Sequence, residues 1–384
     1  MSYKWPLNIN NFNILDKIKI CSFILNPKNR WTQGDQVKTF EDRFTSFIGK
    51  KYSIFVSSGS TANTMLAMYL RDRGENRNTV VFPSTTWITS ISPFLREGFK
   101  PKFIDVTLED LSINLDHLED YLTENHEEVA CVFFTSLLGF VPDIRRIQAI
   151  ADKYKVKIMM DNCENTFGSY EGENISKNFT STTSTYFGHQ LQSVEGGFVF
   201  TDSEEEYNYF LMARNHGMVR SLPGDKSGYL NSLVDSRFDF NILGNNFRNN
   251  NINAFIGGLD LNRVEEYINR RVILYDVFKK HLDMNKFMLP STYSERTHVP
   301  FSLPVISKDP GRKDFILKYC ESVGIETRPI ISGNLLRQTC LKEYDDYTKY
   351  EVSELLNNNG MYVGLYSKLK ESQVVDFVAK INKL

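Results

Sequence analysis

Short, mainly apolar runs alternate with helical patterns through most of the first 260 residues. Runs rich in β-branched and aromatic side chains predict strands, and amphipathic spacing predicts helices between them, at about 60–70 and at 144–154. Apolar strands separated by helices predict an α/β fold whose mostly parallel sheet is covered on both faces. The strands predicted in this way are 53–56, 79–82, 102–105, 129–134, 157–160 and 197–201.

The pattern changes at about residue 262, where a smaller α+β unit is predicted to begin. We therefore expect an N-terminal arm and a large domain over 1–261, and a small C-terminal domain over 262–384. The segments that carry the second pattern are a long helix at 264–282, an apolar run at 299–306, and helices near 314–323 and 372–381.

The composition excludes several classes of protein. The 384 residues carry a net charge of -2, which leaves no excess of basic residues for binding nucleic acid or a membrane surface. No run approaches the ~20 apolar residues of a membrane helix, and the first residues do not resemble a secretory signal. Neither a Gly-x-Gly dinucleotide fingerprint nor a phosphate-binding P-loop occurs. We therefore expect a cytoplasmic protein whose five cysteines are buried thiols rather than metal ligands.

Polar residues follow three of the predicted strands, at the edge of the sheet where ligands bind in such folds. Ser57, Ser84 and Asp161 each come directly after a strand. The turn 57–63, Ser-Ser-Gly-Ser-Thr-Ala-Asn, opens a helix. Its small residues would let N–H groups approach a phosphate at the positive end of the helix dipole. The same residues would also make an ordinary N-cap, so the turn alone leaves both interpretations open.

The segment 181–197 carries the most specific pattern in the chain. Ser184 precedes His189 by five residues, and Glu-Gly-Gly follows at 195–197. This segment resembles the cofactor segment of the DegT/DnrJ/EryC1/StrS sugar aminotransferases, which use pyridoxal phosphate (PLP) and have fold type I of the PLP-dependent transferases, as in aspartate aminotransferase. In that family a lysine stands where this chain has His189. A lysine amine forms a Schiff base with the cofactor aldehyde, whereas an imidazole can only move protons.

The resemblance implies how the cofactor phosphate would be held. Gly59 and Ser60 of the small-residue turn correspond to phosphate-binding positions, and Ser184 corresponds to a further hydroxyl contact. Asn246, in the stretch Leu-Gly-Asn-Asn-Phe-Arg, corresponds to an asparagine that reaches the phosphate from the neighbouring subunit. A site completed in this way implies an obligate homodimer.

Three further residues correspond to contacts with the cofactor ring. Asp161 would pair with the pyridinium nitrogen and keep it protonated, so that the ring can take up electrons; the alternative is a helix cap. Glu164 would lie near the ring hydroxyl. Trp87 would stack on the ring, and its alternative is an ordinary core aromatic.

Arginines are the candidates for substrate contacts, because guanidinium binds carboxylates and phosphates through paired hydrogen bonds. Arg220 and Arg248 are the candidates for a clamp on a dicarboxylate amino donor, which by resemblance is glutamate. Arg328 could contact a nucleotide phosphate or a surface carboxylate. Two stretches are similar to family motifs, and their chemistry cannot be read from the sequence. The resemblance implies that 31–41 positions the substrate or the subunit interface, and that His216, in 213–217, is structural or at an interface rather than catalytic.

Histidine at the lysine position is typical of one branch of the family, the sugar 3-dehydratases, which use the amine form of the cofactor, pyridoxamine phosphate (PMP). One kind acts on CDP-4-keto-6-deoxyglucose with a cysteine-ligated 2Fe–2S centre and an iron–sulfur reductase. The other kind acts on GDP-4-keto-6-deoxymannose without iron. The five cysteines lack the close spacing of cluster ligands, which favours the GDP-sugar kind with no metal and no reductase partner.

The resemblance therefore implies a PLP/PMP-dependent lyase that removes the C3 hydroxyl of the nucleotide sugar and releases ammonia. Its product would serve deoxysugar biosynthesis, such as colitose for a lipopolysaccharide O-antigen. Three other functions stay open: an aminotransferase that makes a 4-amino sugar, a CDP-sugar 3-dehydratase, and a cofactor-binding pseudoenzyme. The retained Asp161, Glu164, Ser184 and Asn246 argue against the last of these.

Overall fold

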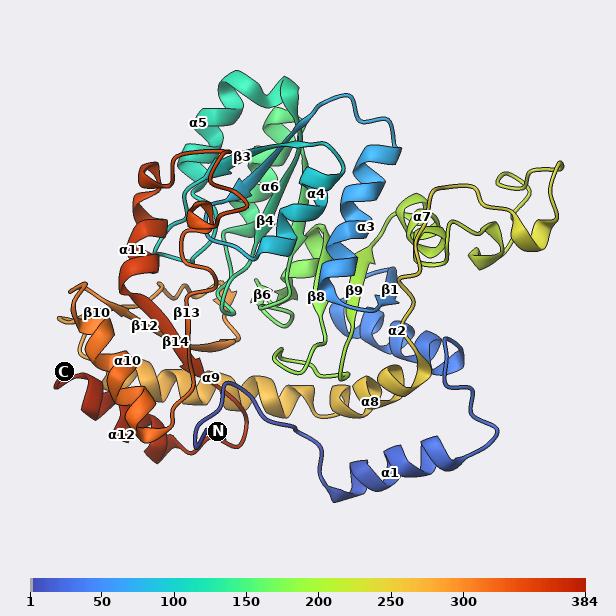
Figure 1. Ribbon diagram of the computed structural model, residues 1–384. Helices are drawn as coiled ribbons and strands as arrows, with labels where there is room; N and C mark the ends of the chain where they lie inside the picture. Colours follow the sequence, from blue (N-terminus) through green and yellow to red (C-terminus); the bar gives the residue numbers. More distant parts are fainter. Residues whose placement is uncertain (1–2) are drawn as a thin grey trace.

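A seven-stranded sheet forms the centre of the computed structural model, which describes residues 3–384 (Figure 1). Within this sheet six strands point the same way and β9 runs against them. The predicted α/β fold with a mostly parallel sheet is confirmed. The strands, in order across the sheet, are β1 (Tyr52–Val56), β9 (Gly197–Thr201), β8 (Thr180–Ser184), β5 (Lys157–Asp161), β4 (Val129–Thr135), β2 (Thr79–Pro83) and β3 (Lys100–Ile104).

Alternate side chains of these strands enter different cores, because successive residues of a strand point to opposite faces. Ile54 and Phe82 pack with α3, α4 and α7 on one face. Val81 packs with α5 and α6 on the other face, and Phe55 packs there with α2 and α8. The helices of this part are α1 (Ile14–Leu25), α2 (Asp35–Ile48), α3 (Gly59–Asp72), α4 (Ser92–Arg96), α5 (Leu115–Asn125), α6 (Ile144–Tyr154), α7 (Glu204–Arg214) and α8 (Asn251–Leu261).

The rest of the chain builds a second layer around a four-stranded antiparallel sheet of order β10-β12-β14-β13. The α8 helix ends at Leu261 and α9 begins at Val264, and the division of the chain at 261/262 stays a prediction. The N-terminal arm joins this layer, because the buried Trp5 donates its indole N–H to the Gly364 carbonyl at 2.9 Å. The elements are α9 (Val264–His281), β10 (Phe287–Met288), β12 (Ser302–Ser307), α10 (Arg312–Val323), β13 (Thr327–Pro329), α11 (Glu351–Asn359), β14 (Gly360–Gly364) and α12 (Glu371–Ile381), with a small sheet of β11 (Arg296–Thr297), β6 (Ser169–Tyr170) and β7 (Glu173–Asn174).

Two strands differ from the expectation. The pattern of apolar runs does not predict β8, since its five residues are threonines and serines whose hydroxyls bond inside the protein. Thr182, for example, donates to the Asn63 side-chain oxygen at 2.6 Å. The apolar run 299–306 becomes a strand only from Ser302, because the N–H groups of Val299 and Phe301 donate instead to the loop 137–141.

The contact between segments 137–141 and 298–301 joins the two layers. Val299 N–H donates to Gly139 O at 3.1 Å and Phe301 N–H donates to Leu138 O at 2.9 Å. Gly139 has a φ of +85°, and a Cβ there would lie 2.0 Å from the Val299 carbonyl oxygen. Only glycine allows this close approach of the two backbones.

His298 in the same contact is expected to make stability depend on pH. Its buried ring accepts the Val141 N–H at Nδ1 (2.9 Å), and burial, with Arg296 nearby, lowers its pKa from 6.5 to about 4. The folded protein therefore binds fewer protons than the unfolded chain between these values, so the free energy of unfolding falls as the pH falls through 6.5. This group should contribute about 2 kcal/mol to the difference between pH 8 and pH 5.

Urea unfolding of His298→Asn at the two pH values tests this expectation. The variant should lose most of that part of the pH dependence, whatever its absolute stability. The exposed His117 provides the control, since His117→Asn should keep the wild-type dependence. An unchanged dependence in His298→Asn would contradict the assignment.

Two apolar surfaces of the chain are exposed. One is a stripe on α1, which corrects the expectation of buried cysteines: Cys21 lies exposed in it, and Cys340 is exposed elsewhere. The other is the projecting segment 222–245, at the right of Figure 1. The apolar stripe consists of Ile14, Ile18, Cys21 and Leu25, and the projecting segment exposes Leu230, Leu233, Val234, Phe238, Phe240 and Leu243.

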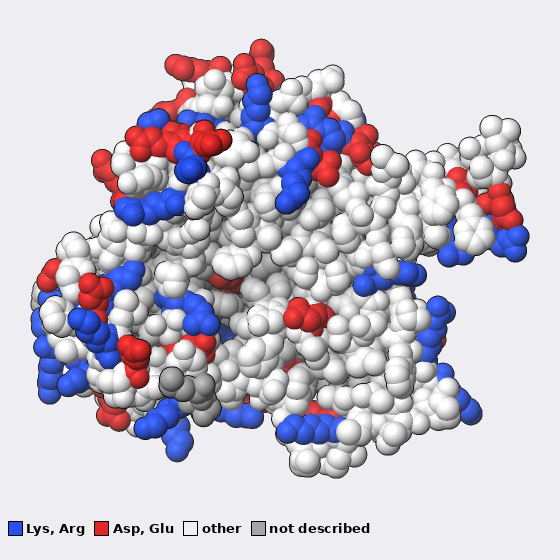
Figure 2. All heavy atoms as spheres, in the orientation of Figure 1, with Lys and Arg blue, Asp and Glu red and all other residues white. Residues whose placement is uncertain are grey.

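Charge is mixed over the visible surface. Lys and Arg side chains lie beside Asp and Glu at the top and left of the face in Figure 2, whereas its middle is mostly uncharged. Among residues 3–384, no helix combines the length and the apolar character needed to span a bilayer.

Candidate active site

One cavity brings most of the predicted site residues together. It has a volume of about 840 Å³ and lies between the carboxyl ends of β1, β5 and β8 and the C-terminal layer. Ligands of open α/β sheets bind at this edge of the sheet. The predicted residues that line the cavity are Gly59, Ser60, Trp87, Asp161, Glu164, Ser184, His189 and Arg328.

The turn after β1 is both an N-cap and a wall of the cavity. Ser58 caps α3 by accepting the Thr61 N–H at 3.1 Å. Gly59 begins the helix, and a Cβ there would lie 2.8 Å from Cys163 Sγ and 3.0 Å from Ser184 Cβ. Glycine thus lets Cys163 and Ser184 pack closely against the start of the helix. Gly59 and Ser60 line the cavity at this N-terminus, where the helix dipole favours an anion.

Asp161, the last residue of β5, presents a carboxylate that hydrogen bonds fix in place. Its Oδ2 accepts from Asn63 Nδ2 at 2.8 Å and from Ser90 Oγ at 2.7 Å, and its Oδ1 accepts the Cys163 N–H at 3.0 Å. No helix starts at this point of the chain, so Asp161 is not a helix cap. The carboxylate is only 3% exposed and its negative charge can pair with a cation in the cavity.

Glu164 lies in the same wall as an uncharged acid. Burial raises the pKa of its carboxyl to about 8, and the Leu138 N–H, which donates to Oε2 at 2.9 Å, opposes that shift. Most Glu164 side chains are therefore protonated at pH 7 and can donate a hydrogen bond to an anionic oxygen.

His189 lies in the loop between β8 and β9, with its ring between two aromatic side chains. The ring centroid is 5.6 Å from that of Phe301 and 6.3 Å from that of Tyr186. Nδ1 is buried and has no hydrogen-bond partner within residues 3–384. Burial lowers the pKa of the imidazole to about 4; Asp161 and the Cys163 backbone oppose this shift, and Arg271 adds to it. The ring is therefore neutral at pH 7, with a nitrogen available for proton transfer.

Trp87 and Arg328 lie on the open side of the cavity. Trp87 is 54% exposed, so it is not a core aromatic. Arg328 donates to Glu326 Oε1 at 2.7 Å, and both side chains line the cavity.

Five residues singled out in the sequence do not line the cavity. Ser57 instead has its hydroxyl 3.0 Å from that of Thr61. Ser84 is fully buried and bonds to Asp105 and Ser353, so its place after a strand does not bring it to the site. Arg220 and Arg248 line a separate hollow of about 530 Å³. Asn246 is exposed beside Arg248, whose Nε donates to its Oδ1 at 2.9 Å.

The comparison with known proteins agrees with this geometry. Residues 20–382 match the model of the DegT/DnrJ/EryC1/StrS aminotransferase family. The chain belongs to this family. It is 30% identical over 351 residues to the GDP-4-keto-6-deoxy-D-mannose 3-dehydratase of Yersinia pseudotuberculosis, with 88% of each chain covered.

Solved dehydratases superimpose on nearly the whole chain. The Escherichia coli GDP-4-keto-6-deoxy-D-mannose 3-dehydratase, solved with bound hydrated PLP, matches with a TM-score of 0.89 at 25% identity, covering 99% of this chain and 100% of that one. A GDP-4-keto-6-deoxymannose 3-dehydratase structure with a trapped PLP–glutamate geminal diamine matches with a TM-score of 0.89 at 26% identity, covering 98% and 100%. The predicted family and its aminotransferase-like fold are thus confirmed.

The prediction of PLP as the cofactor is confirmed at the level of this aminotransferase family. The residues of this chain fit that cofactor on three observations: the helix N-terminus at Gly59 and Ser60 in the cavity wall, the fixed carboxylate of Asp161, and the imidazole of His189 in the same lining. The roles predicted for the individual site residues stay predictions.

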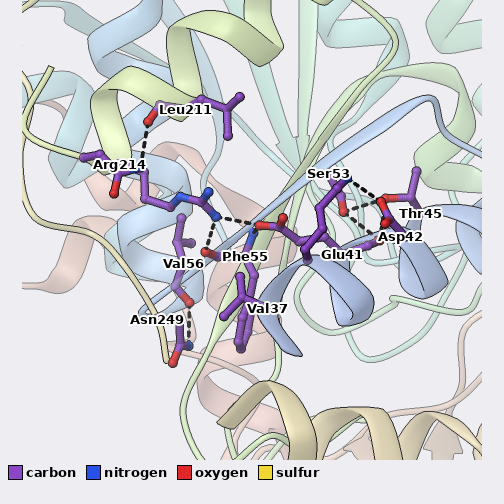
Figure 3. A network of polar contacts seen from close by, with 12 residues as sticks. Val37, Glu41, Asp42, Thr45, Ser53, Phe55, Val56, Leu211, Arg214 and Asn249 are labelled. Atoms are coloured by element: carbon purple, nitrogen blue, oxygen red, sulfur yellow. Dashed lines mark hydrogen bonds and ion pairs between the residues drawn. The ribbon is translucent and has the colours of Figure 1, made fainter. Parts of the chain in front are cut away.

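The two stretches similar to family motifs meet beside the first strand. Glu41 on α2 and Arg214 on α7 form a buried ion pair, with 2.5 Å between Oε1 and Nη1 (Figure 3). Glu41 accepts the Phe55 N–H at 2.8 Å, and Arg214 donates to the Phe55 carbonyl at 3.0 Å. Asn249 then donates to the Val56 carbonyl at 2.8 Å. These side chains satisfy the outer edge of β1 in place of a further strand and so fix the turn that follows it.

Proposed function

We propose that this protein is a PLP/PMP-dependent 3-dehydratase that removes the C3 hydroxyl of GDP-4-keto-6-deoxy-D-mannose, with glutamate as the amino donor. His189 carries the proposal, because it takes the family's lysine position and lines the cavity beside Asp161 and Glu164. The dehydratases that match over nearly the whole chain support it. The product would be a 4-keto-3,6-dideoxy sugar, of the kind used in colitose synthesis.

The chemistry divides between the cofactor and the protein. When bound, PMP supplies an amine for the C4 ketone and a ring that accepts electrons while the C3 oxygen leaves. His189, neutral at pH 7, accepts a proton on the face of its imidazole that lines the cavity and returns one to the departing hydroxyl. Asp161 would hold the ring nitrogen protonated, and Glu164, whose pKa burial raises to about 8, would donate to the ring oxygen. Without a lysine at position 189, no covalent link competes for the cofactor.

We also propose that the working enzyme is a homodimer. The stripe on α1 and the segment 222–245 expose apolar side chains that a second subunit would cover. Asn246 and Arg248 lie beside one another but away from their own cavity. In a dimer both serve the neighbouring cavity, Asn246 at the cofactor phosphate and Arg248, with Arg220, at the dicarboxylate donor.

Incubation with PLP, glutamate and GDP-4-keto-6-deoxymannose tests the proposed reaction. We expect 2-oxoglutarate, ammonia and a sugar product that has lost the C3 oxygen, detected by mass spectrometry. An aminated product that keeps this oxygen would indicate the aminotransferase instead. Turnover of only the CDP-linked keto sugar would indicate the other dehydratase class. Cofactor binding without turnover of any keto sugar would indicate a pseudoenzyme.

A further inference from the structure

The N-terminal arm forms part of the wall of the cavity. Pro6, Leu7 and Asn8 line it, although they are far in sequence from the other lining residues. The arm begins firmly attached to the C-terminal layer, since Lys4 N–H donates to the Gly324 carbonyl at 2.9 Å. Trp5 is also bound to this layer, because its indole N–H donates to the Gly364 carbonyl. The arm therefore approaches the cavity from a fixed starting point.

Glu326 joins the arm to the open side of the cavity. Its Oε2 accepts the Leu7 N–H at 3.0 Å, while its Oε1 accepts from Arg328 at 2.7 Å. The Glu326 N–H donates to the Trp5 carbonyl at 2.8 Å. Glu326 thus fixes the backbone at Trp5 and at Leu7. The Asn8 side chain therefore starts from a fixed position.

The Asn8 side chain points at the loop that carries His189. Asn8 is 7% exposed, and its Nδ2 donates to the Phe187 carbonyl at 2.9 Å and to the His189 carbonyl at 3.2 Å. The next arm residue continues the contact, because Gln192 Nε2 donates to the Ile9 carbonyl at 3.0 Å. One amide group therefore holds the backbone on both sides of Gly188.

This contact matters because nothing covalent fixes His189. In the lysine-bearing members of the family, the bond to the cofactor ties the side chain to the site. A histidine must be positioned by the protein alone. The loop 185–196 lies between β8 and β9 and has no helix or strand of its own. Its own backbone bonds, such as Ser193 N–H to the Thr185 carbonyl at 2.8 Å, close its base, and the contacts from the arm add to them near His189.

We propose that Asn8 is a positioning residue for His189. By binding the carbonyls of Phe187 and His189, the Asn8 side chain keeps the imidazole in place at the cavity. The inference rests on the proposed function of His189 as the base. The Asn8 amide acts through the backbone carbonyls of Phe187 and His189 and has no hydrogen bond to the imidazole.

The test compares Asn8→Ala with Asn10→Ala. Asn10 is an exposed residue of the same arm, so its replacement controls for the loss of an asparagine there. In Asn8→Ala we expect faster hydrogen exchange of the amides of 185–196 and an imidazole pKa that rises from about 4 toward 6.5, followed by NMR of labelled histidine. The signal of His189 is assigned from His189→Asn. Asp161 and Arg271 are present in both the wild type and Asn8→Ala, so a rise in the imidazole pKa reports the entry of water around His189.

The kinetic expectation is a decrease in kcat between about 10- and 100-fold with little change in KM, because displacement of a catalytic group costs turnover rather than binding. Asn8→Asp, which keeps the size but replaces the donor by a carboxylate facing two carbonyls, should be at least as impaired as Asn8→Ala. Wild-type exchange and imidazole pKa in Asn8→Ala would overturn the inference, and so would wild-type behaviour of Asn8→Asp. If the wild type does not dehydrate the sugar, the proposed function fails, while exchange and pKa still test Asn8.

Discussion

Replacement of His189 by asparagine is expected to slow loss of the C3 hydroxyl by on the order of 10²- to 10⁴-fold, the range that a positioned general base contributes. Asparagine is polar and close to histidine in size but cannot take up a proton near neutral pH. The residues proposed to hold the cofactor lie outside the loop of His189, for example Gly59 and Ser60 on α3 and Asp161 on β5. The variant should therefore fold and bind PLP with close to wild-type affinity. Product mass spectrometry and absorbance titration with PLP measure the two effects separately.

His189→Lys provides the companion variant. Its amine can bond to the cofactor aldehyde, so borohydride should fix the cofactor to the peptide that contains residue 189. The wild type treated in the same way should show no modification at this position. Borohydride-fixed cofactor on any residue of the wild-type cavity would contradict the proposed non-covalent site. Near-normal turnover by His189→Asn would remove His189 from the role of base.

The sheet could be predicted from the sequence where burial is apolar. The runs at 129–134 and 157–160 become β4 and β5 because their side chains are packed on both faces. The strand β8 could not be predicted in this way, because its buried positions are polar and depend on partners elsewhere, such as Asn63. The start of β12 at Ser302 likewise depends on a contact with Gly139, far away in the chain.

The residues of the candidate site could likewise be predicted where a local motif marks them, and not where their role depends on distant contacts. Local motifs located Gly59, Asp161 and His189, because each stands at a strand end or in a loop of recognisable sequence. Asn63 and Asn8 were missed, since their roles arise from contacts with residues about 100 or more positions away. A polar residue inside the buried face of a helix is a weak signal that could have indicated Asn63. An isolated asparagine in the arm offers no such signal for Asn8.

The stretches 31–41 and 213–217 show why a motif alone can leave a role unreadable. Glu41 and Arg214 are distant in sequence and act as a pair on the edge of β1. Each residue alone would be a buried charge, which is costly without its partner. Their effect on the cavity is indirect, since they hold the strand that leads into Gly59.

A mixture of two inactive variants is expected to regain activity if Asn246 serves the neighbouring cavity. His189→Asn lacks the base, and Asn246→Ala should lose cofactor affinity because one phosphate contact is gone. Neither pure variant should turn over the sugar appreciably at limiting cofactor. In a mixed dimer, one cavity combines both substitutions, and the other has an intact His189 from one subunit and an intact Asn246 from its partner.

The fraction of wild-type activity that the mixture should recover can be calculated. Equal amounts of the two chains, exchanged through mild denaturation, give half mixed dimers, so about a quarter of all cavities should be intact. Wild-type dimers carried through the same treatment set the full value, and Asn245→Ala, at the adjacent exposed position, should keep its cofactor. If Asn246 acted within its own chain, no mixed dimer would contain an extra intact cavity and the mixture would stay as inactive as its components. The placement of Asn246 away from its own cavity, beside Arg248, is the reason to expect recovery.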